Sequence, residues 1–361
     1  MSSVNRDDVL RALAAVKDPK SGRNVVEAGM VQGLVIKDGK VSFAIEVTAE
    51  NGSAYEPVRL ACAEAVKKLP GVAQVTAVLT AERPASEPPP APHGHGHAQA
   101  KAPVPGVAKI VAVASGKGGV GKSTTAVNLA VALSRLGLRV GLLDVDIYGP
   151  SVPKLLGLSG RPEMGADKKI VPMRAYGIVA MSIGFLLGEP DQAVIWRGPM
   201  VMGAVQQLLA DVAWDAYGPI DVLIADMPPG TGDAQLTMAQ RVPLAGAVIV
   251  STPQDIALID ARKGINMFAR VEVPILGVVE NMSTFICPHC GGESHIFGHG
   301  GAAETAQKFG VPLLAEIPLT IDIRQTSDAG TPIAAIAPEG PQGKAYMALA
   351  RAVAAKLGYP S

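Results

Sequence analysis

The sequence predicts an α/β protein whose main unit has a mainly parallel sheet covered by helices on both faces, preceded by a small α+β domain. Short apolar runs of strand length alternate with helical segments through the last two thirds of the chain, which is typical of parallel sheets with helices on each face. Residues 84–105 are dominated by Pro, Ala, Gly and His, as linkers often are. We therefore expect a small domain at 1–83, a linker at 84–105 and a larger domain at 106–361.

Helical and alternating apolar spacings define the elements of the small domain. A Lys-Asp-Gly-Lys segment between two β-rich runs indicates a hairpin. Cys62 lies at a helical position between apolar neighbours, where we expect buried packing. The expected elements are a helix at Asp7–Lys17, strands at Val31–Ile36 and Val41–Val47, a helix at Tyr55–Leu69 and a strand at Val72–Leu79.

The larger domain contains five apolar strand candidates, and helical segments lie between them. A final helix at Tyr346–Leu357 has only a loose apolar stripe, which is typical of a packing helix and not of a membrane-targeting tail. The expected strands are Lys109–Ser115, Arg139–Asp144, Val222–Asp226, Ala247–Ser251 and Ile275–Glu280, and two of the expected helices are Ser123–Arg135 and Ala257–Phe268.

Length and charge exclude several classes of protein. The 361 residues carry 32 Lys and Arg against 32 Asp and Glu, and 48% of residues are hydrophobic. This length suggests about two domains, and the apolar content excludes a disordered chain. The balanced charge argues against nucleic acid or a membrane surface as a partner along the whole chain. No run reaches the roughly 18 apolar residues that span a bilayer, and the start of the chain does not resemble a signal peptide, so we expect a cytoplasmic protein.

A phosphate-binding loop is the strongest motif. Residues 116–123 read GKGGVGKS, which matches G-x-x-x-x-G-K-S between an expected strand and an expected helix. Glycines let backbone N–H groups approach phosphate oxygens, and the helix N-terminus favours the same negative charge. We expect Lys122 to bridge the β- and γ-phosphates and Ser123 to ligate Mg²⁺. The predicted nucleotide-binding residues of the loop are Gly116, Lys117, Gly118, Gly119, Val120, Gly121, Lys122, Ser123 and Thr124.

The loop carries a second lysine, Lys117, directly after its first glycine. One positive charge already serves the phosphates, so a second suggests a further contact to the transferred phosphoryl group, on the same chain or on a neighbouring subunit. The alternative is a solvated loop lysine.

Acidic residues end two of the expected strands. Asp144 and Asp146 follow one strand, and Asp226 precedes the rigid segment Met-Pro-Pro-Gly-Thr-Gly-Asp. Such acids can hold Mg²⁺ or orient an attacking water. One catalytic acid with one structural cap is the alternative for the first pair. Backbone N–H groups of Gly230 and Gly232 are candidates to contact a γ-phosphate and to move after hydrolysis.

A cysteine pair, Cys287 and Cys290 in C-x-x-C, is compatible with a disulfide couple, a zinc site or an iron–sulfur site. With only three cysteines in the chain, four thiolates at one centre require two copies, which a two-fold axis would bring together. The zinc alternative uses both cysteines with His295 and His299, whose C-x₂-C-x₄-H-x₃-H spacing suits a tetrahedral site in one chain.

These motifs, together with Asp144-Val-Asp-Ile-Tyr-Gly-Pro-Ser151 and Trp196-Arg-Gly-Pro-Met200, resemble the Mrp/ApbC iron–sulfur cluster carrier ATPases over residues 106–357. The K-G-G-x-G-K-S loop is similar to the deviant P-loop of ATPases such as MinD and ParA. Asp18-Pro19 and residues 25–31 resemble the small iron–sulfur-assembly domain that is often fused ahead of these ATPases. The stretch Thr48–Ser53 lacks the cysteine of such domains, so we expect no metal role for the small domain alone.

The resemblance implies a P-loop NTPase fold and a homodimer that holds a [4Fe–4S] cluster through Cys287 and Cys290 of each chain. It implies ATP hydrolysis with Mg²⁺, through Lys117, Lys122, Asp146 and Asp226. Asn281 matches the position that contacts the adenine base. Implied partners are apo iron–sulfur proteins as recipients and scaffold or donor proteins. The alternative function is a zinc-stabilised positioning ATPase of the MinD/ParA kind. His93, His95 and His97 alternate in the linker, where plain low complexity is the simpler interpretation.

Overall fold

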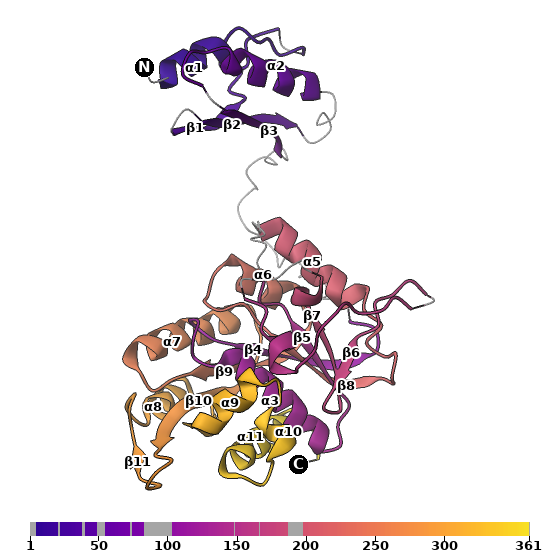
Figure 1. Ribbon diagram of the computed structural model, residues 1–361, viewed down its shortest axis with the longest axis vertical. Helices are drawn as coiled ribbons and strands as arrows, with labels where there is room; N and C mark the ends of the chain where they lie inside the picture. The colour runs from indigo at the N-terminus through magenta and orange to yellow at the C-terminus, as the bar shows by residue number, and fades with distance from the viewer. Residues whose placement is uncertain are drawn as a thin grey trace, which may run out of the picture. The chain divides into compact units, whose positions relative to one another are not determined.

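The computed structural model describes residues 5–20, 22–37, 40–48, 55–72, 74–82, 103–147, 149–165, 167–186 and 198–360. The chain divides into two compact units, Met1–Gly96 and His97–Ser361 (Figure 1). Most of the expected linker with its three histidines lies outside the described residues, as do residues 49–53 and the pair Trp196 and Arg197.

The small unit packs two helices against one face of a three-stranded sheet (Figure 1). Strand β2 pairs with β1 as the expected antiparallel hairpin and with β3 in parallel. Val9, Leu13, Ile45 and Cys62 are fully buried in its core, which confirms the packing role expected for the cysteine. The elements are α1 (Arg6–Leu13), β1 (Val31–Lys37), β2 (Lys40–Thr48), α2 (Glu56–Lys67) and β3 (Gln74–Glu82).

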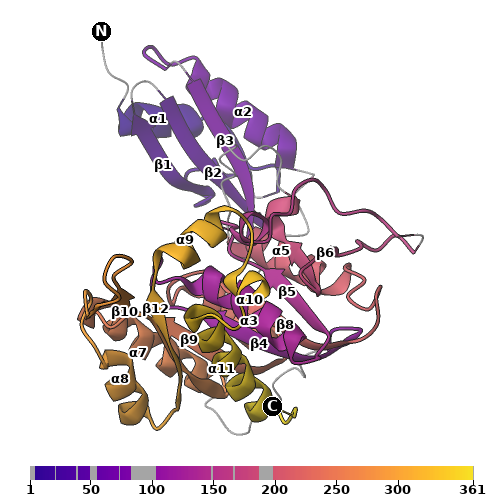
Figure 2. The same ribbon diagram turned by 60° about the horizontal axis from the view of Figure 1, so that its bottom comes forward.

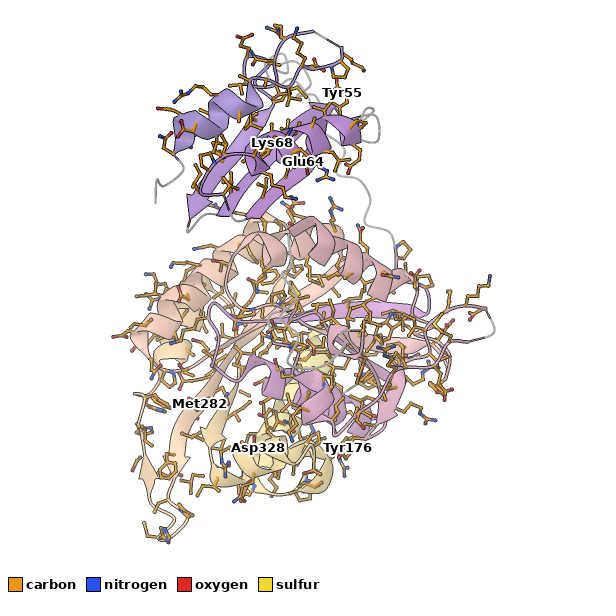
Figure 3. The ribbon with its side chains drawn as sticks, turned by 45° about the horizontal axis from the view of Figure 1, so that its top comes forward. Tyr55, Glu64, Lys68, Tyr176, Met282 and Asp328 are labelled. Atoms are coloured by element: carbon orange, nitrogen blue, oxygen red, sulfur yellow. The ribbon has the colours of Figure 1, made fainter. Side chains whose placement is uncertain are left out.

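The largest boundary differences from the sequence prediction in the small unit are at α1 and β3. Helix α1 ends at Leu13 and not at Lys17, because Lys17 forms an antiparallel bridge with Asn24 and the chain turns away. Beside that turn, the Tyr55 hydroxyl donates to Asp18 Oδ1 at 2.7 Å, so the start of α2 holds the turn in place; Figure 3 labels this tyrosine. Strand β3 begins two residues later than expected, at Gln74.

A mainly parallel sheet forms the centre of the large unit. Among the described residues it has nine strands in the order β11-β10-β9-β4-β8-β5-β7-β6, with β12 paired to β10. Only the β6–β7 and β10–β11 pairs are antiparallel. The strands are β4 (Val107–Ala114), β5 (Val140–Asp144), β6 (Met173–Ala175), β7 (Ile178–Ser182), β8 (Ile220–Asp226), β9 (Leu244–Ser251), β10 (Ile275–Ile286), β11 (Glu293–Ser294) and β12 (Leu313–Leu319).

Helices cover both faces of this sheet, as predicted. One apolar cluster lies under α3, α10 and α11, and the other under α5, α6, α7 and α8 (Figures 1 and 2). The final helix buries Tyr346, Leu349 and Val353, which confirms a packing role. The helices are α3 (Lys122–Arg135), α4 (Val152–Leu155), α5 (Gly198–Ala210), α6 (Asp233–Arg241), α7 (Asp255–Arg270), α8 (Gly301–Phe309), α9 (Ile321–Asp328), α10 (Ile333–Ile336) and α11 (Pro341–Lys356), with a 3₁₀ turn at Ile183–Phe185. No helix of the described residues is long and apolar enough to cross a membrane.

Candidate functional site

The glycine-rich loop connects β4 to α3 and is tightly packed on both sides. Gly119 and Gly121 have φ of +81°, a conformation that side chains with a Cβ rarely adopt. A Cβ at Gly116 would overlap the backbone of Asp260 on α7, and a Cβ at Gly121 would overlap the side-chain amide of Asn281 on β10. The glycines therefore serve the packing of the loop as well as its shape.

A pocket of about 240 Å³ lies over this loop. It brings together most of the predicted nucleotide-binding residues with Asp146. Its lining residues are Ser115, Lys117, Gly118, Gly119, Gly121, Lys122, Ser123, Thr124, Asp146, Ser151, Leu155 and Pro229. Ser151, Leu155 and Pro229 were not predicted from the sequence as site residues. Ser151 could have been found from the motif Asp-Ile-Tyr-Gly-Pro-Ser, and Pro229 from the motif Met-Pro-Pro-Gly.

The other predicted residues lie just behind the pocket. Val120 is buried, and its carbonyl oxygen accepts a hydrogen bond from Asn281 Nδ2 at 2.8 Å. Asn281 thus supports the loop directly, a contact that the sequence did not reveal. Its predicted contact with adenine stays a prediction.

Lys122 is buried among acids. Its Nζ lies 2.5 Å from Asp226 Oδ1 and 3.4 Å from Asp146 Oδ2, and it donates to Ser123 Oγ at 3.1 Å. Burial raises the pKa of Asp226, while the charge of Lys122 beside it acts in the opposite direction. The structure therefore assembles Lys122, Ser123, Asp146 and Asp226, as the sequence predicted.

Two carboxylate oxygens at this centre fit a magnesium ion. Asp146 Oδ1 and Asp226 Oδ2 are buried and accept no hydrogen bond from a described residue. Buried acceptors without partners are costly, and oxygen ligands of this kind are those that Mg²⁺ prefers. Ser123 Oγ next to them supplies a neutral oxygen. Together these three side chains form a suitable donor set for Mg²⁺.

Asp144 has a structural role, which resolves the alternative left open for the first acidic pair. Its carboxylate accepts hydrogen bonds from Asp146 N at 3.1 Å, Val152 N at 3.2 Å and Ser182 Oγ at 2.8 Å. Complete burial and the nearby charge of Asp226 raise the pKa of Asp144 to about 7. The side chain organises the segment after β5 and leaves Asp146 to face the pocket.

The segment after β8 is docked on the glycine-rich loop. Gly230, with φ of +93°, donates its N–H to the Ser115 carbonyl oxygen at 3.0 Å. This N–H group has a protein partner, so it would have to leave Ser115 before contacting a γ-phosphate. The segment can therefore respond to occupation of the pocket.

Lys117 is half-exposed at the edge of the pocket and forms no ion pair with a described residue. Helix α7, whose backbone touches Gly116, exposes Ile256 and Ile259 by 69% and 49%. A free cation and an exposed apolar pair therefore accompany the phosphate loop.

The cysteine pair lies at the tip of a hairpin formed by β10 and β11. Cys287 N donates to Gly292 O and Gly291 N donates to Cys287 O, both at 2.9 Å, which closes the turn. The pKa of Cys287 is lowered because the N–H groups of His289 and Cys290 and the thiol of Cys290 donate to its sulfur. Cys287 is half-buried and Cys290 is exposed, so the pair offers accessible sulfur ligands.

The four residues of the zinc alternative do not form one group of converging ligand atoms among the described residues, and the alternative stays a hypothesis. The rings of His295 and His299 contact each other with centroids 4.4 Å apart. Among the described residues, the group of three or more metal-ligating side chains is Glu280, His299 and Glu316, and it contains neither cysteine. Glu280 already has a structural role, because its carboxylate accepts the N–H of Ala302 at 2.8 Å at the start of α8.

Comparisons with known proteins agree on one family. Residues 106–354 match the family described as NUBPL iron-transfer P-loop NTPase, and residues 6–77 match that of an iron–sulfur cluster assembly protein. An iron–sulfur cluster carrier protein of Synechocystis sp. is 45% identical over 97% of this chain and 97% of its own. One of Haemophilus influenzae is 54% identical over 70% of this chain and 67% of its own.

Solved structures confirm the fold. A nucleotide-binding protein from Archaeoglobus fulgidus in complex with ADP is 41% identical, with a TM-score of 0.55, and the match covers 62% of this chain and 87% of that chain. The septum site-determining protein MinD from Pyrococcus horikoshii, complexed with Mg-ADP, is 22% identical with a TM-score of 0.50, over 68% of this chain and 95% of that chain. The second likeness concerns the fold alone.

Proposed function

Because this chain belongs to the NUBPL iron-transfer P-loop NTPase family, we propose that it is an ATPase that carries an iron–sulfur cluster and delivers it to recipient proteins. One observation carries the proposal. Strand β10 supports the phosphate loop through Asn281 and ends five residues later, at Ile286, directly before a pair of accessible cysteines. A nucleotide site and a metal-binding pair therefore share one strand. A positioning ATPase is not favoured, because a relative that matches almost the whole chain is named a cluster carrier.

Lys122 and the loop amides bind ATP. Lys122 contacts Asp226 and Asp146 and also lines the pocket, so its three N–H donors can serve these acids and the phosphate oxygens together. Ser123, Asp146 and Asp226 hold Mg²⁺, which neutralises charge on the phosphate oxygens. Asp146 or Asp226 orients the attacking water, and Asn281 contacts the adenine base.

Two chains share one cluster. A [4Fe–4S] cluster takes four thiolates, and each chain offers Cys287 and Cys290, so a two-fold axis through the cluster completes the ligand set. Lys117 lies at the pocket edge without an ion-pair partner among the described residues, beside a helix that exposes Ile256 and Ile259. These features suit a homodimer in which Lys117 contacts nucleotide across the interface.

The cluster comes from a scaffold or donor protein and goes to apo iron–sulfur proteins. Exposed thiols such as Cys290 stay reduced in the cytoplasm, where the proposal places the protein. Each transfer exchanges the thiolates of this chain for those of the recipient.

Anaerobic reconstitution with iron and sulfide tests the proposal. Iron, sulfide, zinc and oligomeric mass are measured for wild type, Cys290→Ala and the paired variant His295→Ala/His299→Ala. We expect about two iron and two sulfide per chain in a dimer, lost in Cys290→Ala and kept in the histidine variant. A monomer that holds one zinc without sulfide, and loses it when the histidines are replaced, would refute the carrier function.

A further inference from the structure

Strand β10 contacts the phosphate loop through Asn281, and Met282 is the next residue along the strand. Asn281 Nδ2 donates to the Val120 carbonyl oxygen at 2.8 Å, and Asn281 is 7% exposed. Met282 follows, and its Cε lies 3.9 Å from the position that a Cβ on Gly121 would occupy. A displacement of Val120 therefore acts on β10 through the Asn281 hydrogen bond, one residue before Met282.

The same point is where β10 leaves regular pairing. Its register with β9 ends at Glu280 opposite Ser251. Its register with β12 passes from Asn281 opposite Ile317 to Phe285 opposite Leu319, so β10 uses more residues than its neighbour over this interval. This is a bulge, and bulges re-aim the chain that follows them.

Met282 has a strained backbone within the bulge (labelled in Figure 3). Its φ is +58°, a left-handed conformation in which the Cβ approaches the following carbonyl oxygen. Such residues persist where the surroundings impose the conformation, and they occur often at switch regions. Here the surroundings are the phosphate loop on one side and the β12 pairing on the other.

The cysteine hairpin begins directly after the bulge. Phe285 pairs with Ser294 and Ile286 with Glu293, and Cys287 follows. Between the bulge and the hairpin, Ser283 Oγ donates to the Ile317 carbonyl oxygen at 3.2 Å. The direction in which the hairpin points is thus set by the backbone at residues 282–284.

We propose that Met282 is a positioning residue that couples the phosphate loop to the cysteine pair. Nucleotide binding at the loop shifts Val120, Asn281 transmits the shift, and the strained backbone at Met282 converts it into a reorientation of the hairpin. The inference rests on the proposed function for its biological purpose, because it gives ATP a route to the sulfur ligands. The coupling itself is a property of the cluster-free chain.

Hydrogen–deuterium exchange on the cluster-free full chain tests the coupling. Amide exchange is measured with and without a saturating, slowly hydrolysed ATP analogue and Mg²⁺. Protection at 116–124 reports binding, and exchange at 285–294 reports the hairpin. Met282→Gly removes the strain and should fold, since glycine adopts φ of +58° readily. Glu272→Gly is the matched control, because Glu272 has the same φ of +58° but precedes β10, away from the loop contact.

We expect wild type and Glu272→Gly to change exchange at 285–294 when the analogue binds, and Met282→Gly to lose this response while keeping protection at 116–124. Asn281→Ala should also lose the response at 285–294, when it is measured at an analogue concentration that gives full protection at 116–124. Protection at 116–124 in wild type without a change at 285–294 would overturn the inference, as would a full response in Met282→Gly. Neither result depends on cluster binding, so the reconstitution described above fails or succeeds separately.

Discussion

Replacing Lys122 tests whether the acids around the phosphate loop depend on its charge. Lys122 Nζ lies 2.5 Å from Asp226 Oδ1, with side-chain exposures of 6% and 0%. Lys122→Ala leaves Asp226 buried without its cation. Asp226→Asn removes the carboxylate instead and leaves Lys122 with Asp146 at 3.4 Å.

The expected energies follow from this geometry. Removing one partner of a buried ion pair costs about 3–5 kcal/mol, and we expect the lower end, about 3 kcal/mol, because Asp226 can take up a proton. Asp226→Asn should cost less than about 1 kcal/mol, since it also relieves repulsion with Asp144. In the double variant the two effects should not add, and we expect an interaction energy of about 2 kcal/mol.

Urea unfolding followed by tryptophan fluorescence measures these energies in the large unit, because both tryptophans, Trp196 and Trp214, belong to it. The pH dependence is a second check. The pKa of Asp226 is raised by burial and held down by Lys122, so without Lys122 its neutral form is favoured further. The stability that this neutral form gives is present at low pH and lost as pH rises, so the deficit of Lys122→Ala should grow from pH 5 to pH 8. Additivity within about 0.5 kcal/mol, or a deficit independent of pH, would refute the reasoning.

Three further predictions concern single residues. Gly121→Ala should lower the melting temperature and weaken nucleotide binding, because φ is +81° and the new methyl overlaps Asn281. Gly118→Ala, with open space around it, should keep the melting temperature. Calorimetry with and without ATP distinguishes the two variants. Asp144 has a pKa of about 7 in the folded protein against 3.8 ordinarily, so the stability from its neutral form is complete below about pH 4 and lost as pH rises through 7. In urea titrations, the free energy of unfolding of wild type should therefore fall by about 3 kcal/mol more than that of Asp144→Asn between pH 5 and pH 8. Parallel plots of unfolding free energy against pH for the two proteins would contradict this. Lys117→Ala should leave the free energy of unfolding within about 0.5 kcal/mol of wild type, since the side chain is half-exposed without an ion pair to a described residue. It should nevertheless abolish ATP hydrolysis, measured by phosphate release. Retained hydrolysis would show that Lys117 is a solvated loop lysine.

The sheet could be predicted from the sequence where strands are apolar on both faces. The runs that became β4, β5, β8, β9 and β10 are such strands, because helices cover both sides of the central sheet. Strand β7 (Ile178–Ser182) was missed although it is buried throughout, and the edge strands β6 and β12 escaped prediction because they are only partly buried. Strand β6 has three residues and no fully buried one, and β12 is half-exposed over most of its length. A strand with partial burial lacks the apolar run that marks a central one.

The site could be predicted where chemistry fixes residue types at fixed spacing. The phosphate loop and its acids are such a case, and Lys122, Asp146 and Asp226 meet as expected. The cysteine pair is less certain from sequence, because spacing alone does not give direction: the His299 ligand atom lies with those of Glu280 and Glu316, and the choice between zinc and a cluster is left to the reconstitution. The role of Asn281 in holding Val120 depends on a contact between residues 161 positions apart, which no local pattern encodes.

The contacts of the phosphate loop explain how one event can affect two parts of the molecule. On one side Gly116 touches α7, which exposes Ile256 and Ile259 and is therefore suited to contact a second chain. On the other side Gly121 touches Asn281 on β10, which leads to the cysteines. Protein interiors are close-packed, so a loop held between two such contacts cannot move without displacing at least one of them. A nucleotide in the pocket contacts this loop directly, because Gly118, Gly119 and Gly121 line the pocket. In the proposed homodimer, a movement of this loop would therefore reach both the contact between the chains and the geometry of the cysteines.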